Sequence, residues 1–133
     1  MILANDLRKG NWVRTTDTVG RVSQIFWNKA ELFTERNGQA DYIDFDYDDL
    51  EPISLTPEII HQCGFYKHEL FPHRNAFHHK KFIFNINIVG NIYELSYGLI
   101  AENVAIIYQR NLYLHQLQNL FYLLTNEELD IIL

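Results

Sequence analysis

The sequence predicts an α+β protein: an N-terminal small twisted sheet or half-open β-barrel, one short central helix, then an antiparallel meander covered by a C-terminal helix. Residues 1–53 contain short alternating segments separated by turn signals, which are typical of strands. Residues 112–129 carry the three-and-four apolar spacing of an amphipathic helix. The 9 Phe, 8 Tyr and 2 Trp also favour strands. For 133 residues we expect a single compact domain, 1–133, with sub-parts 1–53 and 54–133.

Five short strands are expected in the first sub-part, at residues 11–14, 21–27, 30–34, 42–47 and 50–55. Asn37-Gly38 is the strongest hairpin signal, because both residues tolerate the positive φ angles of a type I′ turn. The fourth strand alternates most clearly. One face of it carries Ile43, Phe45 and Tyr47, and the other carries Asp44, Asp46 and Asp48. Strands this short and close together predict the twisted sheet or half-open barrel.

The second sub-part is expected to begin with a helix. Thr56 is a favourable N-cap, Pro57 suits the first helical position, and Gly64 is a stop signal. Residues 65–79 have no clear periodicity, and Pro72 argues against a central strand there. Alternation within 81–89, 92–97 and 99–108 predicts an antiparallel meander of three or four strands.

The C-terminal helix is expected to cover this meander with one apolar stripe, formed by Leu114, Leu117, Leu120, Phe121 and Leu124. Its other side carries His115, Gln116, Gln118 and Asn119. No charged residue lies between Asn111 and Asn126, so we expect that a neighbouring loop or a second subunit can cover part of this side as well. Thr125 and Glu128 are spaced as a capping box that starts a second short turn. The alternative is a groove-binding or dimerising helix with Tyr113 and Tyr122 at its rim, so a homodimer stays open.

Composition limits the function classes. The formal net charge of −6 weakens a role in sequence-independent nucleic-acid binding, which usually requires excess Lys and Arg. Cys63 is the only cysteine, so no intrachain disulfide can form and a reducing compartment fits. The N-terminal segment has no signal-peptide pattern, and no apolar run is long enough to span a membrane. We therefore expect a cytoplasmic protein with no membrane partner.

The chain resembles a family of small uncharacterised proteins from Bacteroidetes genomes, prophages and mobile elements in three stretches: LRKGNWV, DLEPISLTPEIIHQCGF and YLHQLQNLFYLLTNEELDI. In that family a "PI-LT-E" helix ends in a Gly-Phe pair, and a helix similar to VHQLQNLYFALTGEEL closes the chain. The join matches at Pro52, Ile53, Leu55, Thr56, Glu58, Gly64 and Phe65. The tail matches at His115, Gln116, Leu117, Gln118, Asn119, Leu120, Leu124, Thr125, Glu127, Glu128 and Leu129. The match departs at Asn126, where the family pattern has Gly, and throughout the His-rich middle of the chain. The resemblance implies a fold and a cellular setting, and no activity.

The acidic strand is the first candidate site. Each of Asp44, Asp46 and Asp48 is about 6.6 Å from the next along one strand face, so the three carboxylates do not converge on a calcium ion without a bend. We interpret them as a solvated face. The alternatives are a partner-facing acidic patch, including one that mimics a nucleic-acid backbone, and a metal site.

The histidines are the second candidate. His68, His73, His78 and His79, with His61, Cys63 and Glu69 nearby in sequence, match no zinc spacing. We interpret them as exposed loop histidines, with a metal or a pH-linked contact as the alternative.

Cys63 lies on the expected buried face of its helix, which favours an inert thiol. Because the chain has neither a Gly-x-Ser-x-Gly elbow nor a glycine-rich phosphate loop, we name no catalytic residue and no cofactor.

The third candidate is an aromatic and basic surface on the N-terminal strands. It would be formed by Trp12, Phe26, Trp27 and Phe33 with Arg14, Arg21 and Lys29. In a sheet this small we expect most of these aromatic residues to be core.

Three functional hypotheses follow, in this order. The first is a non-enzymatic protein-interaction module, phage or mobile-element associated, with partner-facing residues among Asp44, Asp46, Asp48, Arg14, Arg21, Tyr113 and Tyr122. The second is a nucleic-acid-binding small β-barrel protein that uses Arg8, Lys9, Arg14 and Arg21, or Arg74, Lys80 and Lys81. The third is a His-rich metal protein or enzyme.

Overall fold

The computed structural model describes residues 2, 4–36, 38–67, 75–98 and 105–133, with only the backbone described at 36 and 105–110. The chain divides into two compact units. The first unit contains Met1–Ser54 and Tyr113–Leu120, and the second contains Leu55–Leu112 and Phe121–Leu133. The first unit thus ends next to the predicted division at residue 53, but it also includes the first half of the C-terminal helix. A single compact domain stays a prediction.

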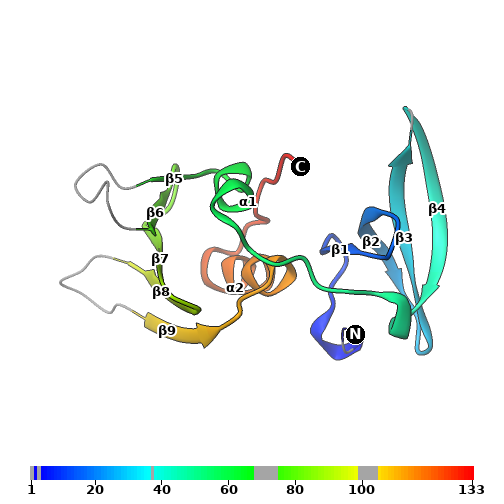
Figure 1. Ribbon diagram of the computed structural model, residues 1–133, viewed down its shortest axis with the longest axis horizontal. Helices are drawn as coiled ribbons and strands as arrows, with labels where there is room; N and C mark the ends of the chain where they lie inside the picture. The colour runs from blue at the N-terminus through cyan, green and yellow to red at the C-terminus, as the bar shows by residue number, and fades with distance from the viewer. Residues whose placement is uncertain (1, 3, 37, 68–74, 99–104) are drawn as a thin grey trace. The chain divides into compact units, whose positions relative to one another are not determined.

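The first unit contains a four-stranded antiparallel sheet in which the strands pair in chain order (Figure 1). The strands are β1 (Trp12–Arg14), β2 (Val19–Ile25), β3 (Lys29–Arg36) and β4 (Gln39–Asp46). Two 3-10 turns, η1 (Ala4–Asp6) and η2 (Tyr47–Asp49), flank them. Among the described strands β1 and β4 are edges that do not pair with each other, so the sheet is open and no closed barrel forms. The core under the sheet consists of Ile2, Leu7, Val13, Val22, Ala30, Leu32 and Leu50.

The predicted hairpin fixes the register of β3 and β4. Arg36 pairs with Gln39, which leaves a two-residue connection whose Gly38 has a φ angle of +77°. Asn37 lies outside the described residues. The fifth predicted strand, 50–55, is wrong: this segment forms only isolated bridges, from Glu51 to Arg14 and from Ser54 to Tyr113. Its backbone follows β1 too briefly to form a ladder.

The second unit contains α1 (Pro57–Gln62) and an antiparallel meander of five strands, β5 to β9 (Figure 1). These are β5 (Phe65–Lys67), β6 (Asn75–His79), β7 (Phe84–Val89), β8 (Ile92–Tyr97) and β9 (Ala105–Arg110). The prediction of an irregular segment at 65–79 is wrong at both ends, since β5 and β6 lie there. Both strands are short, so their alternation is too brief to recognise in a sequence rich in His and aromatic residues.

The predicted start and stop of α1 are confirmed. The Thr56 hydroxyl accepts a hydrogen bond from the backbone N–H of Ile59 at 3.2 Å, and Pro57 occupies the first turn. Gly64, with a φ angle of +85°, follows the helix and Cys63. Side-chain capping and the left-handed glycine therefore act together to fix this helix at six residues.

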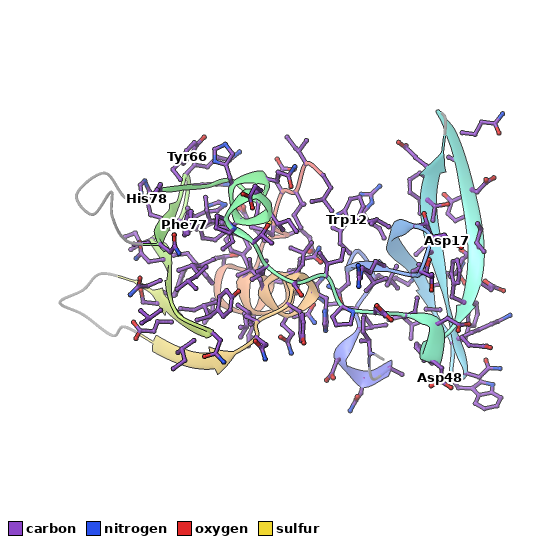
Figure 2. The ribbon with its side chains drawn as sticks, viewed as in Figure 1. Trp12, Asp17, Asp48, Tyr66, Phe77 and His78 are labelled. Carbon is purple, nitrogen blue, oxygen red and sulfur yellow. The ribbon has the colours of Figure 1, made fainter. Side chains whose placement is uncertain are left out.

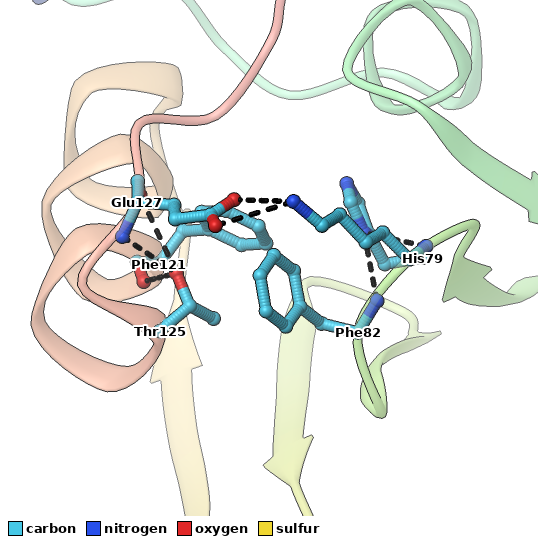
Figure 3. Close-up of polar contacts among 6 residues, drawn as sticks. His79, Phe82, Phe121, Thr125 and Glu127 are labelled. Carbon is cyan, nitrogen blue, oxygen red and sulfur yellow. Dashed lines mark hydrogen bonds and ion pairs between the residues drawn. The ribbon is translucent and has the colours of Figure 1, made fainter.

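Helix α2 (Leu114–Thr125) buries the predicted stripe at Leu114, Leu117 and Phe121. In the second unit the Phe121 ring lies 5.5 Å from that of Phe82 (Figure 3). It also lies 5.4 Å from the ring of Phe84. The C-terminal half of α2 therefore packs against the sheet of the second unit, on the face where the Phe84 side chain of β7 lies.

The side of α2 opposite the apolar stripe is partly covered, which the lack of charged residues between Asn111 and Asn126 allowed for. His115 and Gln118 are buried, because residues 4–12 cover that side of the helix in the first unit. The second short turn expected after Thr125 is not present, since residues 126–133 contain no helix. The Thr125 hydroxyl donates to the Phe121 carbonyl at 2.7 Å and accepts from the Glu127 N–H at 3.2 Å, so Thr125 ends the helix (Figure 3).

Candidate functional site

The outer face of the N-terminal sheet carries a row of four side chains that runs across all four strands. Strand register places Trp12 opposite Arg21, Arg21 opposite Phe33, and Phe33 opposite Tyr42. We call these four residues the transverse row. Because side chains alternate between the two faces of a sheet, the core residues Val13, Val22 and Leu32, next to row members along the chain, point the other way.

The members of the transverse row touch their neighbours. The Arg21 guanidinium carbon lies 5.6 Å from the centre of the Trp12 ring and 5.4 Å from that of Phe33, which is the range of cation–π contact. The rings of Phe33 and Tyr42 meet edge to face at 5.3 Å. Tyr42 is 64% exposed, so the row ends at β4 with an open aromatic side chain.

Arg21 differs from the other basic residues of the sheet strands with described side chains. Arg14 is paired with Glu51 at 3.0 Å, and Lys29 is paired with Asp44 at 2.8 Å. No carboxylate among the described residues forms an ion pair with Arg21. Two aromatic rings hold its side chain in place while the guanidinium N–H donors stay open to a partner.

The acidic residues predicted as a site do not form one cluster. Asp44 and Asp46 lie on β4 and share the face of Tyr42. The Asp44 carboxylate is bonded to Lys29, and this hydrogen bond raises the pKa of the lysine. Asp48 lies in η2 beyond the strand, so the predicted three-aspartate face is correct only for its first two members (Figure 2).

The helix residues predicted to face a partner belong to different units. Tyr113, in the first unit, precedes α2, and its backbone N–H donates to the side chain of Gln116 at 3.0 Å. Its ring stacks on that of His115 at 6.3 Å. Tyr122, in the second unit, is 40% exposed. A common binding rim at these two tyrosines stays a prediction.

The histidines do not converge within the part of the chain that is described. His68 and His73 lie outside the described residues. His78 and His79 end β6 and point to opposite faces, as adjacent residues in an extended strand do. The ring of His78 lies 6.3 Å from that of Tyr66, next to it across β5 and β6 (Figure 2). No group of three or more His, Cys, Asp or Glu side chains among the described residues is arranged to hold a metal ion.

His79 is part of the core and not of a loop. It is buried against Phe65, Phe82 and Phe121. Its Nδ1 accepts hydrogen bonds from the backbone N–H groups of Lys81 at 3.1 Å and Phe82 at 3.3 Å (Figure 3). Burial, helped by the nearby lysine charges, lowers the pKa of His79 below its usual value. The imidazole is therefore held neutral by its structural environment.

His61, in contrast, is exposed. It lines an open hollow of about 370 Å³ in the second unit together with Tyr66, Lys80 and Asp130. Its Nδ1 lies 3.2 Å from the Phe65 carbonyl oxygen, which fixes the ring at the hollow's edge.

Cys63 is fully buried, and desolvation raises the pKa of its thiol to about 12. The expectation of an unreactive thiol is therefore supported by its surroundings. His115 is buried as well, and desolvation lowers its pKa. Its Nδ1 has no hydrogen-bond partner among the described residues.

The sequence predicted a surface that includes Trp12, Arg21 and Phe33, but it favoured a core position for the aromatic residues. Tyr42 was not predicted as a neighbour of these residues, although the sequence contains a signal that places it there. The Asn37-Gly38 turn implies a two-residue hairpin, and counting back from it places Phe33 opposite Tyr42.

Comparison with known proteins gives no match to a protein-family model, to a curated protein or to a solved structure. None of the described helices has the length and apolar character needed to cross a lipid bilayer.

Proposed function

We propose that this chain is a non-enzymatic protein-interaction module and that the transverse row is the centre of its docking face. The observation that carries this proposal is the stacking of Arg21 between Trp12 and Phe33 on an outward-facing side of a sheet, next to the open ring of Tyr42.

The composition of the row supports this role. Trp, Tyr and Arg are the residues most enriched among those that dominate binding energy at protein interfaces. In a row they offer large, rigid contact area and lose little conformational freedom when a partner binds, because neighbouring rings already hold Arg21.

A single-stranded nucleic acid is the second candidate, because bases also stack on aromatic and guanidinium surfaces. Charge argues against it. Glu31, Glu35, Asp44 and Asp46 lie on the strands that carry Phe33 and Tyr42, and they repel a phosphate backbone. Arg8, one of the basic residues named for this role, instead donates to Asn119 at 3.2 Å.

The described histidines give a metal protein or enzyme no support, so we do not propose that alternative. On sequence grounds alone we propose a cytoplasmic setting, and an association with phages or mobile elements as the family resemblance implies.

The test compares capture of partners from a Bacteroidetes lysate by the immobilised wild-type chain and by an Arg21→Ala/Tyr42→Ala variant, with mass spectrometry as the readout. We expect the double variant to lose at least 90% of a reproducible protein partner, since two central interface residues each contribute on the order of 2 kcal/mol. Tyr66→Ala, at a tyrosine 47% exposed in the second unit, is the matched control and should retain the partner.

Two results would contradict the proposal. One is equal capture by the wild type and the double variant when both have the same far-ultraviolet circular dichroism. The other is a gel shift of a single-stranded oligonucleotide at low salt that the double variant abolishes, which would favour the nucleic-acid candidate.

A further inference from the structure

We propose that the outer edge of β4 binds an extended, basic segment of the partner protein by strand addition. This inference rests on the proposed function and specifies the chemistry of the partner. The partner strand would extend the sheet from four strands to five and would place one side chain beside Tyr42, at the open end of the transverse row.

The edge of β4 is long and regular. Its eight residues, Gln39–Asp46, pair with β3 from Arg36 to Lys29 without a register shift. No described strand pairs with its other side. In an antiparallel pair alternate residues direct their N–H and C=O groups away from the neighbouring strand, so this side of β4 offers a row of free backbone groups.

The opposite edge of the same sheet is protected. β1 has three residues, and the backbone of Arg14 exchanges hydrogen bonds with Glu51, at 3.0 Å and 2.8 Å. The Gln118 side chain accepts from the N–H of Trp12 at 2.8 Å and donates to the carbonyl of Gly10 at 3.0 Å. The fold therefore covers the outer backbone groups of β1 and leaves those of β4 open.

The sequence of β4, QADYIDFD, has no proline, no lysine and no bulge, so only its negative charges guard the edge. These charges belong to Asp41, Asp44 and Asp46. Edge-to-edge pairing with a second copy would bring these carboxylates together, and their repulsion disfavours self-association. A basic segment is instead attracted by these carboxylates, so the occupant that fits this edge is a basic segment.

Strand register predicts which kinds of side chain the partner segment places opposite each residue of β4. On the face of the transverse row, basic side chains belong opposite Asp46 and Asp44, and an aromatic side chain belongs opposite Tyr42. On the other face an apolar side chain belongs opposite Ile43, which is 36% exposed, and a basic one opposite Asp41. Written for antiparallel pairing, one such segment is Lys-Val-Arg-Ile-Tyr-Lys.

The test titrates the full-length chain with this hexapeptide, acetylated and amidated, and follows fluorescence polarisation of an attached dye. Two N-methylated forms of the peptide are compared, each methylated on one set of alternate residues. Strand addition requires the N–H groups of only one set, so we expect one form to bind at least tenfold more weakly and the other to bind within about twofold of the parent.

Charge is tested on the protein side. Asp41→Asn/Asp46→Asn should weaken binding threefold to tenfold, an effect that shrinks at high salt, because exposed ion pairs are worth roughly 0.2–1 kcal/mol each. Asp17→Asn, at an exposed aspartate in the turn after β1, is the matched control and should bind as the wild type does.

Three outcomes would overturn the strand-addition proposal: no binding of the peptide, equal binding of both methylated forms, or a wild-type dimer in sedimentation that Asp41→Lys strengthens, as the loss of carboxylate repulsion at a shared β4 edge predicts. The last would mean that a second copy occupies the edge. If the edge experiments fail while Arg21→Ala/Tyr42→Ala still loses its captured partner, the docking face stands and only the edge inference falls.

Discussion

The side-chain oxygen of Gln118 accepts a hydrogen bond from the backbone N–H of Trp12 at 2.8 Å, across a sequence separation of 106 residues. The amide nitrogen of the same side chain donates to the Gly10 carbonyl at 3.0 Å. One glutamine thus pairs with the edge of β1 as a neighbouring strand would. Since Trp12 begins the transverse row, this contact helps to position the candidate docking face.

Gln118→Ala should lower the free energy of unfolding by about 2 kcal/mol, because it removes both bonds and leaves a partly buried donor and acceptor without partners. Equilibrium urea denaturation followed by tryptophan fluorescence measures this loss. Leu123→Ala is the control: this residue lies on the same helix, is 77% exposed, and should change stability by less than about 0.5 kcal/mol. A loss for Gln118→Ala no larger than that of the control would mean that the contact contributes nothing to stability.

Local sequence signals are sufficient to predict the structure wherever one short segment determines its own conformation. The N-cap at Thr56, the proline at position 57 and the hairpin at Asn37-Gly38 act through hydrogen bonds and backbone angles within a few residues. The α+β class and the two antiparallel sheets follow from such signals added along the chain.

The remaining features of the fold and of the candidate site depend on contacts between distant segments, which the sequence does not display. The uncharged polar side of α2 indicates that something covers it, but the sequence does not show that Gly10, Asn11 and Trp12 supply the hydrogen-bond partners of Gln118 and Asn119 there. Likewise, Trp12 and Phe33 were expected in the core because they are aromatic. The face they occupy is set by strand register, which a composition argument does not contain.

Acid should weaken the protein through His79. Burial lowers its pKa in the folded state, so the unfolded state binds a proton first as the pH falls. The stability contribution is therefore complete above the unfolded value near pH 6.5 and is lost as the pH falls through the folded value. Protonation would also set a new N–H against the backbone donors of Lys81 and Phe82.

Urea midpoints measured between pH 7.5 and pH 4.5 test this. We expect the free energy of unfolding to fall as the pH drops below about 6.5, with a slope of at most about 1.4 kcal/mol per pH unit for each such histidine. His79→Asn, whose amide oxygen can replace Nδ1 as the acceptor, should reduce the slope and leave the share due to His115. Leu123→Ala, at an exposed residue that does not titrate, should keep the wild-type slope. An unchanged slope in His79→Asn would show that this imidazole does not govern the acid response.

Asn126→Gly should stabilise the chain by roughly 0.5–1 kcal/mol. Asn126 follows the last residue of α2 with a φ angle of +59°, and its N–H donates to the Tyr122 carbonyl at 2.8 Å, which is the left-handed cap of a helix end. Asn tolerates this conformation better than other residues with a side chain, but Gly adopts it without steric cost. Asn126→Ala is the opposing variant and should destabilise by about 1 kcal/mol, so thermal unfolding should rank Gly above Asn and Asn above Ala. A stability order with Ala equal to Gly would show that the left-handed angle is not what selects the residue at this position.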